Sequence, residues 1–397
     1  MTEQRSELDI IIVGGGVVGC LLARALKHTD LKIGIVEARA YQPQQGHPGF
    51  DSRTLALARH SAHYLWQLGF KPQLSQFSTP IQSIKITDQG HLGQCYLDSQ
   101  SQGIEALGYV ISQQQLGTML YSALQSQDLQ WHCPDTIHAL GLAQDKVTLT
   151  LASGQVLSSS LLVVADGGDS PTARLLGVNS NIEDYAQVAL VANVECELLH
   201  KQRAFERFTG HGPLALLPIG ERQAGLVWSL AKTMQDDFAG LTDEALLSKL
   251  QQAFGYDLGR FTRISRRTLY PLRLVTSETN LLHRCLILGN AAHTLHPIAG
   301  QGFNLGLRDV EQLAALLASH TGQDPGMFSL LNQYHQARQG DQRKVIGLTD
   351  SLVRLFSNQY APLVVGRNMG LGLLQGCQSV KNLLAWQAMG YAEKQDA

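Results

Sequence analysis

The sequence lacks both a long hydrophobic run and an excess of charge of one sign. Its 397 residues carry 31 Lys and Arg against 33 Asp and Glu, for a formal net charge of −2. No run of about 18 apolar residues occurs that would span a bilayer. The balanced charge and the absence of a basic arm argue against a nucleic-acid partner. Because the polar start MTEQRSELD does not resemble a secretory signal, we expect a cytoplasmic protein that meets the inner membrane only peripherally, if at all.

Cysteine is scarce and unpaired in spacing. No CxxC or CxxxxC motif occurs, which argues against a structural zinc site, a redox disulfide and a secreted disulfide framework. A reducing compartment and no bound metal are therefore expected. The six cysteines are Cys20, Cys95, Cys133, Cys196, Cys285 and Cys377.

Glycine is abundant, and its first cluster follows a predicted buried strand over residues 10–13. The sequence GGGVVG follows this strand and leads into a helical pattern. This order of strand, glycines and helix matches the dinucleotide fingerprint GxGxxG. In this fingerprint one glycine permits the turn, one lets the backbone approach a pyrophosphate, and one allows close packing of helix on strand. A second strand ends in an acid suited to bind a ribose. The expected contacts are Gly14, Gly16, Val17, Val18, Gly19 and Glu37.

Two later strands also end in glycine and a polar side chain. Residues 161–165 precede Asp166 and Gly167, and residues 285–288 precede Gly289 and Asn290. In a doubly wound sheet such strand ends meet at the carboxyl edge, where ligands bind. An Asp-Gly pair after a strand is also common in ordinary turns. We expect the three strand ends to converge on one extended ligand.

The order of GxGxxG, Asp-Gly and GNAAH followed by HPIAGQGFNLGLRD resembles FAD-dependent aromatic hydroxylases related to para-hydroxybenzoate hydroxylase. The strings HPGFDSRTLAL, AFERFTGHGPLALLP and TDSLVRLF are similar to those of the ubiquinone-biosynthesis hydroxylases, and the resemblance covers nearly the whole chain. One departure is Asn290, where the wider family has Asp. An amide keeps an acceptor oxygen but loses the charge, so a weaker contact to the ribityl chain is expected.

The resemblance implies an α/β fold in which a doubly wound FAD-binding domain is interleaved with a β-sheet substrate domain and followed by a C-terminal helical segment. The expected FAD-binding domain comprises 1–75, 98–180 and 270–345. The substrate domain comprises 76–97 and 181–269, and the helical region 346–397. The last region has apolar and basic residues but no acid from 351 to 392, so it is expected either to pack on the flavin domain or to dock on a membrane or partner.

The resemblance also implies individual site residues. Arg53 would reach the FAD pyrophosphate and Gln113 the ribityl chain, while the carbonyl of Pro297 would lie near the reactive edge of the flavin. His293 and His296 are either proton carriers or structural histidines. Backbone along the flavin ring is expected at Ala299, Gly300, Gln301, Gly302 and Asn304, before a helix beginning near Phe303. Candidate substrate contacts are Phe208, Leu216, Leu217 and Pro218. Replacing Gly300 with leucine is expected to leave folding intact.

The expected activity is that of an FAD-dependent monooxygenase that takes electrons from NADH or NADPH. It would hydroxylate a hydrophobic polyprenyl-methoxyphenol para to its hydroxyl with O2, through a C4a-hydroperoxyflavin, in ubiquinone biosynthesis. Three alternatives stay open: a hydroxylase of another ring position, a flavin-dependent isoprenoid reductase, and a non-catalytic flavin-binding subunit of a multi-enzyme complex.

Overall fold

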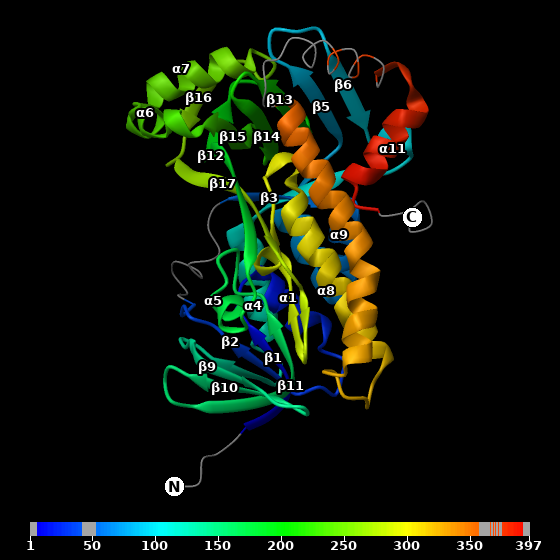
Figure 1. Cartoon of the computed structure of the whole chain (residues 1–397). Coiled ribbons are helices and arrows are strands. Elements are labelled where there is room, and N and C mark those ends of the chain that lie inside the picture. The colour runs from blue at the N-terminus through cyan, green and yellow to red at the C-terminus, as the bar shows by residue number, and fades with distance from the viewer. Residues whose placement is uncertain are drawn as a thin grey trace.

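The computed structural model describes residues 6–41, 53–356 and 375–391, together with Gly366, Asn368, Gly370 and Gly372. Two β-sheets lie at opposite ends of this part of the molecule, and two long helices run side by side between them (Figure 1). These helices are α8 (Gln301–Ser319) and α9 (Phe328–Phe356). No helix within these described ranges has the length and hydrophobicity needed to cross a membrane.

The first sheet contains the predicted nucleotide-binding strands. In the described chain its order is β18-β19-β11-β1-β2-β8, and the neighbouring strands from β19 to β8 are parallel. In addition, β10 pairs with β11, and β9 pairs with β10. The three strands expected to converge, β1, β11 and β19, are therefore adjacent, as predicted. The bounds are β1 (Ser6–Val13), β2 (Ile33–Val36), β8 (Leu129–His132), β9 (Ile137–Leu142), β10 (Val147–Leu151), β11 (Val156–Val164), β18 (Leu281–Leu282) and β19 (Cys285–Ile287).

Each face of this sheet packs against a different layer. Ile10 and Ile12 belong to a core that includes α1 (Val17–Ala25), α4 (Gln113–Leu124) and α8. On the other face Ile11 shares a core with Leu149 of the antiparallel β10. The apolar residues of β1 are buried on both faces, as expected for a central parallel strand.

The second sheet contains the strands that were expected to belong to the substrate domain. Its order in the described chain is β20-β17-β12-β15-β14-β13-β5-β6, with β16 paired to β12. One face packs on α7 (Asp243–Phe254), whose N-cap residue Thr242 accepts a hydrogen bond from the Ala245 amide at 3.3 Å. The bounds are β5 (Ser83–Asp88), β6 (Gln94–Asp98), β12 (Ser180–Cys196), β13 (Arg203–Thr209), β14 (Gly212–Ile219), β15 (Gln223–Ala231), β16 (Phe261–Ile264), β17 (Thr268–Ser277) and β20 (His293–Thr294).

A small third sheet, β3-β7-β4, completes the strands of the described chain. It is made of β3 (Thr54–Ala58), β7 (Gly108–Ser112) and β4 (Thr79–Ile81). The remaining helices are α2 (Arg59–Leu65), η1 (Trp66–Phe70), α3 (Lys71–Phe77), η2 (Gln100–Gln102), α5 (Pro171–Leu175), η3 (Lys232–Met234), α6 (Gln235–Gly240), η4 (Gly289–Ala291), η5 (Ile298–Gly300) and α11 (Gln378–Ala388).

Two expected boundaries differ from the observed elements. β17 continues to Ser277 and pairs with β12 along its length, so this sheet extends beyond residue 269. α9 runs without a break through the boundary expected at 345, because the change in composition there does not interrupt the helical pattern. The division into domains remains a prediction in its details.

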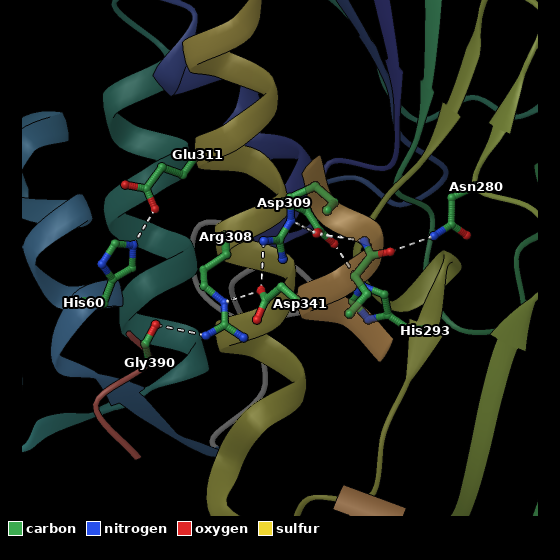
Figure 2. Close-up of polar contacts among 10 residues, drawn as sticks. His60, Asn280, His293, Arg308, Asp309, Glu311, Asp341 and Gly390 are labelled. Carbon is green, nitrogen blue, oxygen red and sulfur yellow. Dashed lines mark hydrogen bonds and ion pairs between the residues drawn. The ribbon is translucent and has the colours of Figure 1, made fainter. Parts of the chain in front are cut away.

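A buried polar cluster holds α8 against α9 (Figure 2). Asp309 of α8 is fully buried and accepts hydrogen bonds from Arg338 Nε at 2.8 Å and Gln342 Nε2 at 2.9 Å, both on α9. His293 Nε2 lies 2.8 Å from its other carboxylate oxygen. Burial alone raises the pKa of Asp309, but the hydrogen bonds and charges of His293 and Arg338 outweigh burial and hold the pKa below its ordinary value. The carboxylate is therefore charged at neutral pH.

The cluster extends along both helices. Arg308 Nε lies 3.1 Å from Asp341 Oδ2, and Arg338 Nη1 lies 2.8 Å from the same oxygen. Arg308 also donates a hydrogen bond to the carbonyl of Gly390 at 2.9 Å, which ties the end of the described C-terminal segment to α8 (Figure 2). The cluster thus fixes the helix whose N-terminus faces the candidate site.

We expect Asp309→Asn to lower the free energy of unfolding by roughly 3 to 5 kcal/mol, because it leaves the buried Arg338 with less opposing charge. Urea titration of the FAD-saturated protein at pH 7.5 measures this loss. The pKa of Asp309 is depressed on folding, so its stabilisation is present above the ordinary carboxyl pKa and is lost as the pH falls toward the lower folded value. The deficit should therefore be constant from about pH 6 to 8.

Glu311→Gln on the same helix is the matched control. Glu311 pairs with His60 at 2.6 Å, and the two side chains are 29% and 24% exposed. A partly solvated pair of this kind contributes about 1 kcal/mol or less. Equal losses in the two variants would contradict a special role for the buried cluster.

Candidate active site

One large cavity, of about 1570 Å³, is lined by residues of all three sheets and of α8, α9 and α11. Typical small-molecule sites measure about 300 to 1,000 Å³, so this one has room for a dinucleotide and a second ligand. Its polar lining gathers where β1, β11 and β19 end. Its apolar lining comes from one face of the nine-stranded sheet and from the C-terminal helices.

The three fingerprint glycines in and after the turn between β1 and α1 have different surroundings, as expected from their different roles. Gly14 has φ +104°, and a Cβ there would lie 2.4 Å from the Ala165 carbonyl oxygen at the end of β11. A Cβ on Gly19 would lie 2.0 Å from the Gly14 carbonyl oxygen, so Gly19 permits close packing of helix and strand. Gly16 lines the cavity, and a Cβ there would meet nothing within 4 Å. Only Gly16 of these three opens its Cα toward ligand space.

The other two strand ends contact the same turn. Asp166, Gly167, Gly289 and Asn290 all line the cavity together with Val18 of α1. A Cβ on Gly289 would lie 3.0 Å from Val18 Cγ2, so strand end and helix already touch. The convergence expected of the three glycine-bearing strand ends is therefore present in the structure.

Glu37 and Asp166, the two carboxylates expected to contact the cofactor, line the polar part of the cavity. Glu37 accepts hydrogen bonds from the Gly15 amide at 2.6 Å and the Arg39 amide at 2.8 Å. Asp166 accepts from the Thr172 amide at 3.1 Å through one oxygen, while the other oxygen is buried with no hydrogen-bond partner among the described residues. A buried carboxylate oxygen without a donor is costly, and a ligand hydroxyl would satisfy it. This observation fits the FAD expected here.

The N-terminus of α8 also faces the cavity, through Gly300, Gly302 and Asn304. The helix begins at Gln301, two residues earlier than expected, and its first turn has no side-chain cap and no acid. Its amide hydrogens and positive dipole end therefore favour a negative group beside them. Pro297 lines the cavity just before this turn.

Asn304 has a structural task that the sequence did not reveal. Its carbonyl accepts from the Ala58 amide at 2.8 Å, and its amide donates to the carbonyls of Ala56 at 2.9 Å and Gly300 at 2.7 Å. The side chain therefore ties α8 to β3, although the residue still lines the cavity. Gln301 does not line the cavity, and the side chain of Ala299 lies outside the described structure.

Arg53 and Gln113 come together across the small sheet. Pairing of Thr54 with Ser112 in β3 and β7 places them at one end, where the Gln113 amide donates to the Arg53 carbonyl at 2.8 Å. Both residues line the cavity, and the Arg53 guanidinium carbon lies 4.7 Å from the centre of the Tyr270 ring. Their assignment to the FAD pyrophosphate and ribityl chain remains a prediction.

The geometry disfavours the proton-transfer role considered for the two histidines. His293 is 1% exposed and paired with Asp309, and His296 is 1% exposed with its Nδ1 accepting from the Ile298 amide at 3.2 Å. Burial lowers the pKa of His296 to about 4, so its ring is neutral at neutral pH. Neither residue lines the cavity. Their neighbours Thr294, Leu295 and Pro297 do.

The candidate substrate contacts divide between the two faces of the second sheet. Phe208 and Leu217 line the cavity. Leu216 and Pro218 do not, because successive side chains of β14 point to opposite faces and Leu216 enters the core beneath α7. These two expected contacts are therefore not supported.

Two further parts of the lining were missed from the sequence. Glu206 of β13 faces the cavity between Ala204 and Phe208, and period-two alternation along AFERF was the available signal. The C-terminal helices contribute apolar side chains, which favours packing on the site over a free docking face for these residues. They are Leu352, Leu355, Leu384 and Ala388.

Comparison with known proteins agrees with this geometry. A family model described as "FAD binding domain" matches residues 7–348. Ubiquinone hydroxylase UbiL of Rhodospirillum rubrum is 34% identical over 386 residues, covering 96% of this chain and 89% of the relative. The 3-demethoxyubiquinol 3-hydroxylase of Escherichia coli is 28% identical and covers 99% of both chains. The crystal structure of p-nitrophenol 4-monooxygenase PnpA from Pseudomonas putida superposes with a TM-score of 0.79 at 14% identity, covering 98% of this chain and 100% of that one.

The family match, the hydroxylase relative and the glycine-lined cavity define an FAD-dependent monooxygenase in which one sheet carries the nucleotide turn and the other covers the cavity. The solved structure, at its low identity, supports the fold alone. The chain belongs to the FAD-binding monooxygenases of the ubiquinone hydroxylase family.

The structure changes the expectation for Gly300. Its φ is +61°, and a Cβ there would lie 3.1 Å from the Ala56 Cβ. A leucine would be strained in this conformation, so its effect on FAD binding would be mixed with a loss of stability. Gly16, with φ −71° and ψ −175°, is the better test position because this extended conformation suits any residue.

We expect Gly16→Val to fold normally but to retain less than about a tenth of the FAD, because its side chain would occupy the space that the phosphates need. The ratio of flavin absorbance to protein absorbance after gel filtration measures the loss. Gly141→Val is the matched control, since a Cβ there also meets nothing within 4 Å and the residue lies outside the cavity lining. A Gly16 variant that stays as yellow as the control would overturn the placement of the cofactor.

Proposed function

We propose that this protein hydroxylates a polyprenyl-methoxyphenol para to its hydroxyl, with NAD(P)H and O2, as a 2-polyprenyl-6-methoxyphenol hydroxylase of ubiquinone biosynthesis. The single observation that carries the proposal is the continuity of the cavity from the nucleotide turn to an apolar sheet face. When bound, FAD supplies the activation of O2 for transfer to an electron-rich ring. The protein supplies position, shielding from water and electrostatics.

The N-terminus of α8 supports the redox part of the proposal. Reduction adds negative charge to a flavin, and the uncapped first turn at Gly300 and Gly302 offers backbone donors and a positive dipole end to that charge. Asn304 holds this turn against β3 through three hydrogen bonds, so the donors need no rearrangement when charge develops. Pro297 lines the cavity just before this turn, and we propose that its carbonyl lies beside the reacting edge of the flavin.

The apolar part of the cavity supports a hydrophobic substrate. Ile84, Ile86 and Leu97 line it from the second sheet, opposite Leu355 of α9 and Leu384 of α11. Burying an isoprenoid chain here gains about 25 cal/mol per Å² of apolar surface. No arginine among the described residues lines this part, so these residues offer no clamp for an aromatic carboxylate. A neutral phenol with an isoprenoid tail is the substrate that fits both features.

A second position on the same ring is the competing function. The Escherichia coli relative is named for hydroxylation at position 3 of a demethoxyubiquinol, and its similarity covers 99% of both chains. Both functions would use the same cofactor and the same cavity, so the ring position is the point to test.

We expect a strain lacking this protein to accumulate a polyprenyl-methoxyphenol that has no oxygen para to its hydroxyl. We also expect the purified FAD-loaded protein to convert that compound with one ¹⁸O atom from ¹⁸O2 and consumption of NAD(P)H. Mass spectrometry of the strain and of the reaction measures both. Accumulation of a demethoxyubiquinol would support the competing ring position instead.

Two other results would overturn hydroxylation itself. Product formation without ¹⁸O, together with reduction of a prenyl double bond, would indicate an isoprenoid reductase. Bound FAD with no NAD(P)H oxidation beside any quinone precursor would indicate a non-catalytic subunit.

A further inference from the structure

Among the described residues that line the apolar part of the cavity, Glu206 is the single carboxylate. In the second sheet, Val191 pairs with Val227, Val227 with Ala215, Ala215 with Glu206, and Glu206 with Ile86. All five residues line the cavity, so they form one row that crosses β12, β15, β14, β13 and β5. Glu206 is the only charged member of this row. A carboxylate in such a place is costly unless it meets a polar partner.

The neighbouring charges are directed elsewhere. Lys85 and Arg207 are each one position away from the paired residues Ile86 and Glu206, so their side chains lie on the opposite face of the sheet. On that face Lys85 pairs with Asp257 at 2.6 Å. From β12 and α9, the Tyr185 hydroxyl donates to Asp350 at 3.1 Å. Among the described residues, none forms a hydrogen bond or an ion pair with the Glu206 side chain, although its backbone is paired within the sheet. The other charged residues lining the cavity gather at the nucleotide end and are Glu37, Arg39, Arg53, Asp135, Asp166 and Asp169.

Glu206 also lies on the side of the cavity where the flavin edge is expected. Phe208 is two residues further along β13 on the same face, a separation of about 7 Å along a strand. Phe208 packs in one cluster with Ile298, which follows Pro297 directly, and with Ile86, which pairs with Glu206. A ring placed between Pro297 and this face would therefore come within reach of the Glu206 side chain.

The chemical state of Glu206 suits a proton acceptor. Burial raises the pKa of Glu206 to about 7. A general base is most effective when its pKa is near the working pH, because it is then both ionised and basic. Hydroxylation of a phenol needs such a group, since the ring becomes more nucleophilic as its hydroxyl loses the proton. No histidine among the described residues lines the cavity to serve instead.

We propose that the Glu206 carboxylate accepts the hydrogen bond of the substrate's ring hydroxyl and takes its proton as the ring is hydroxylated. This inference rests on the proposed function. The phenol O–H bond breaks and a carboxyl O–H bond forms; the hydrogen on the attacked carbon leaves to solvent as a proton, and the carboxyl proton then returns to the ring oxygen. The same charge repels aromatic carboxylates, so Glu206 also selects neutral phenols.

The first test is binding to the oxidised, FAD-loaded protein at pH 8, which needs no turnover. The probes are 2-prenylphenol and its methyl ether, which lacks the hydroxyl proton, and the change in flavin absorbance gives each Kd. The natural protein should bind the phenol at least about tenfold more tightly than the ether, as expected for a hydrogen bond to a charged group. In Glu206→Leu the two Kd values should be nearly equal. An unchanged ratio would overturn the proposal.

The second test uses Glu206→Gln, which keeps a hydrogen-bond acceptor but cannot take the proton. For the natural protein, kcat/KM should rise as the pH increases through about 7, because Glu206 becomes ionised over that range. In Glu206→Gln this rise should disappear and kcat should fall by about 10²-fold or more, while KM changes by only a few fold. Persistence of the rise near pH 7 would overturn the proposal. If Glu206→Leu does not fold, this profile decides alone.

Glu195→Gln is the matched control. Glu195 lies on β12 in the same sheet, outside the cavity lining, and its carboxylate is 3.8 Å from Arg263 at the surface. Its kcat, KM and Kd ratio should equal those of the natural protein. A natural protein that shows the Kd difference but incorporates no ¹⁸O would refute the proposed function and leave the contact of Glu206 with the phenol intact.

Discussion

The structure depends on main chain approaching main chain where three parallel strands end. A side chain on Gly14 would strike the end of β11, and one on Gly289 would strike α1. These contacts draw the three strand ends together, while Gly16 leaves its Cα open to the cavity. One oxygen of Asp166 has no hydrogen-bond partner among the described residues, and the N-termini of α1 and α8 have no side-chain cap. These polar groups are therefore available to hydrogen-bond one ligand in the cavity. The cofactor site is therefore a consequence of how closely the strands can meet.

α8 connects the nucleotide turn to α9 and to the described C-terminal segment. Its N-terminus lies at the site, and its middle is held to α9 through the buried carboxylate of Asp309. Arg308 adds the C-terminal segment through Gly390, and α11 in that segment lines the apolar part of the cavity. The nucleotide turn, the pair of helices α8 and α9 that run side by side (Figure 1), and the described C-terminal segment are thus connected through α8.

The sequence predicted the cofactor half of the site better than the substrate half. Glycine spacing and strand ends depend on local backbone geometry, so GGGVVG, Asp166-Gly167 and Gly289-Asn290 indicated the convergence correctly. Which face of a strand meets a cavity depends on pairing with distant strands. For that reason Leu216 and Leu217 were not distinguished, and Glu206 was overlooked inside AFERFT. The sequence left the role of His293 open between a proton carrier and a structural histidine, because its partner, Asp309, lies on a helix that comes later in the chain.

Hydrogen–deuterium exchange with and without FAD tests the central claim most directly. The account predicts that FAD slows hydrogen–deuterium exchange in all four peptides that cover the contact segments, which are residues 14–18, 166–168, 289–291 and 300–304. Peptides of β10, none of whose residues lines the cavity, should change little. Protection of only one of the four segments, or of none, would contradict a cofactor held by backbone from three separate strand ends.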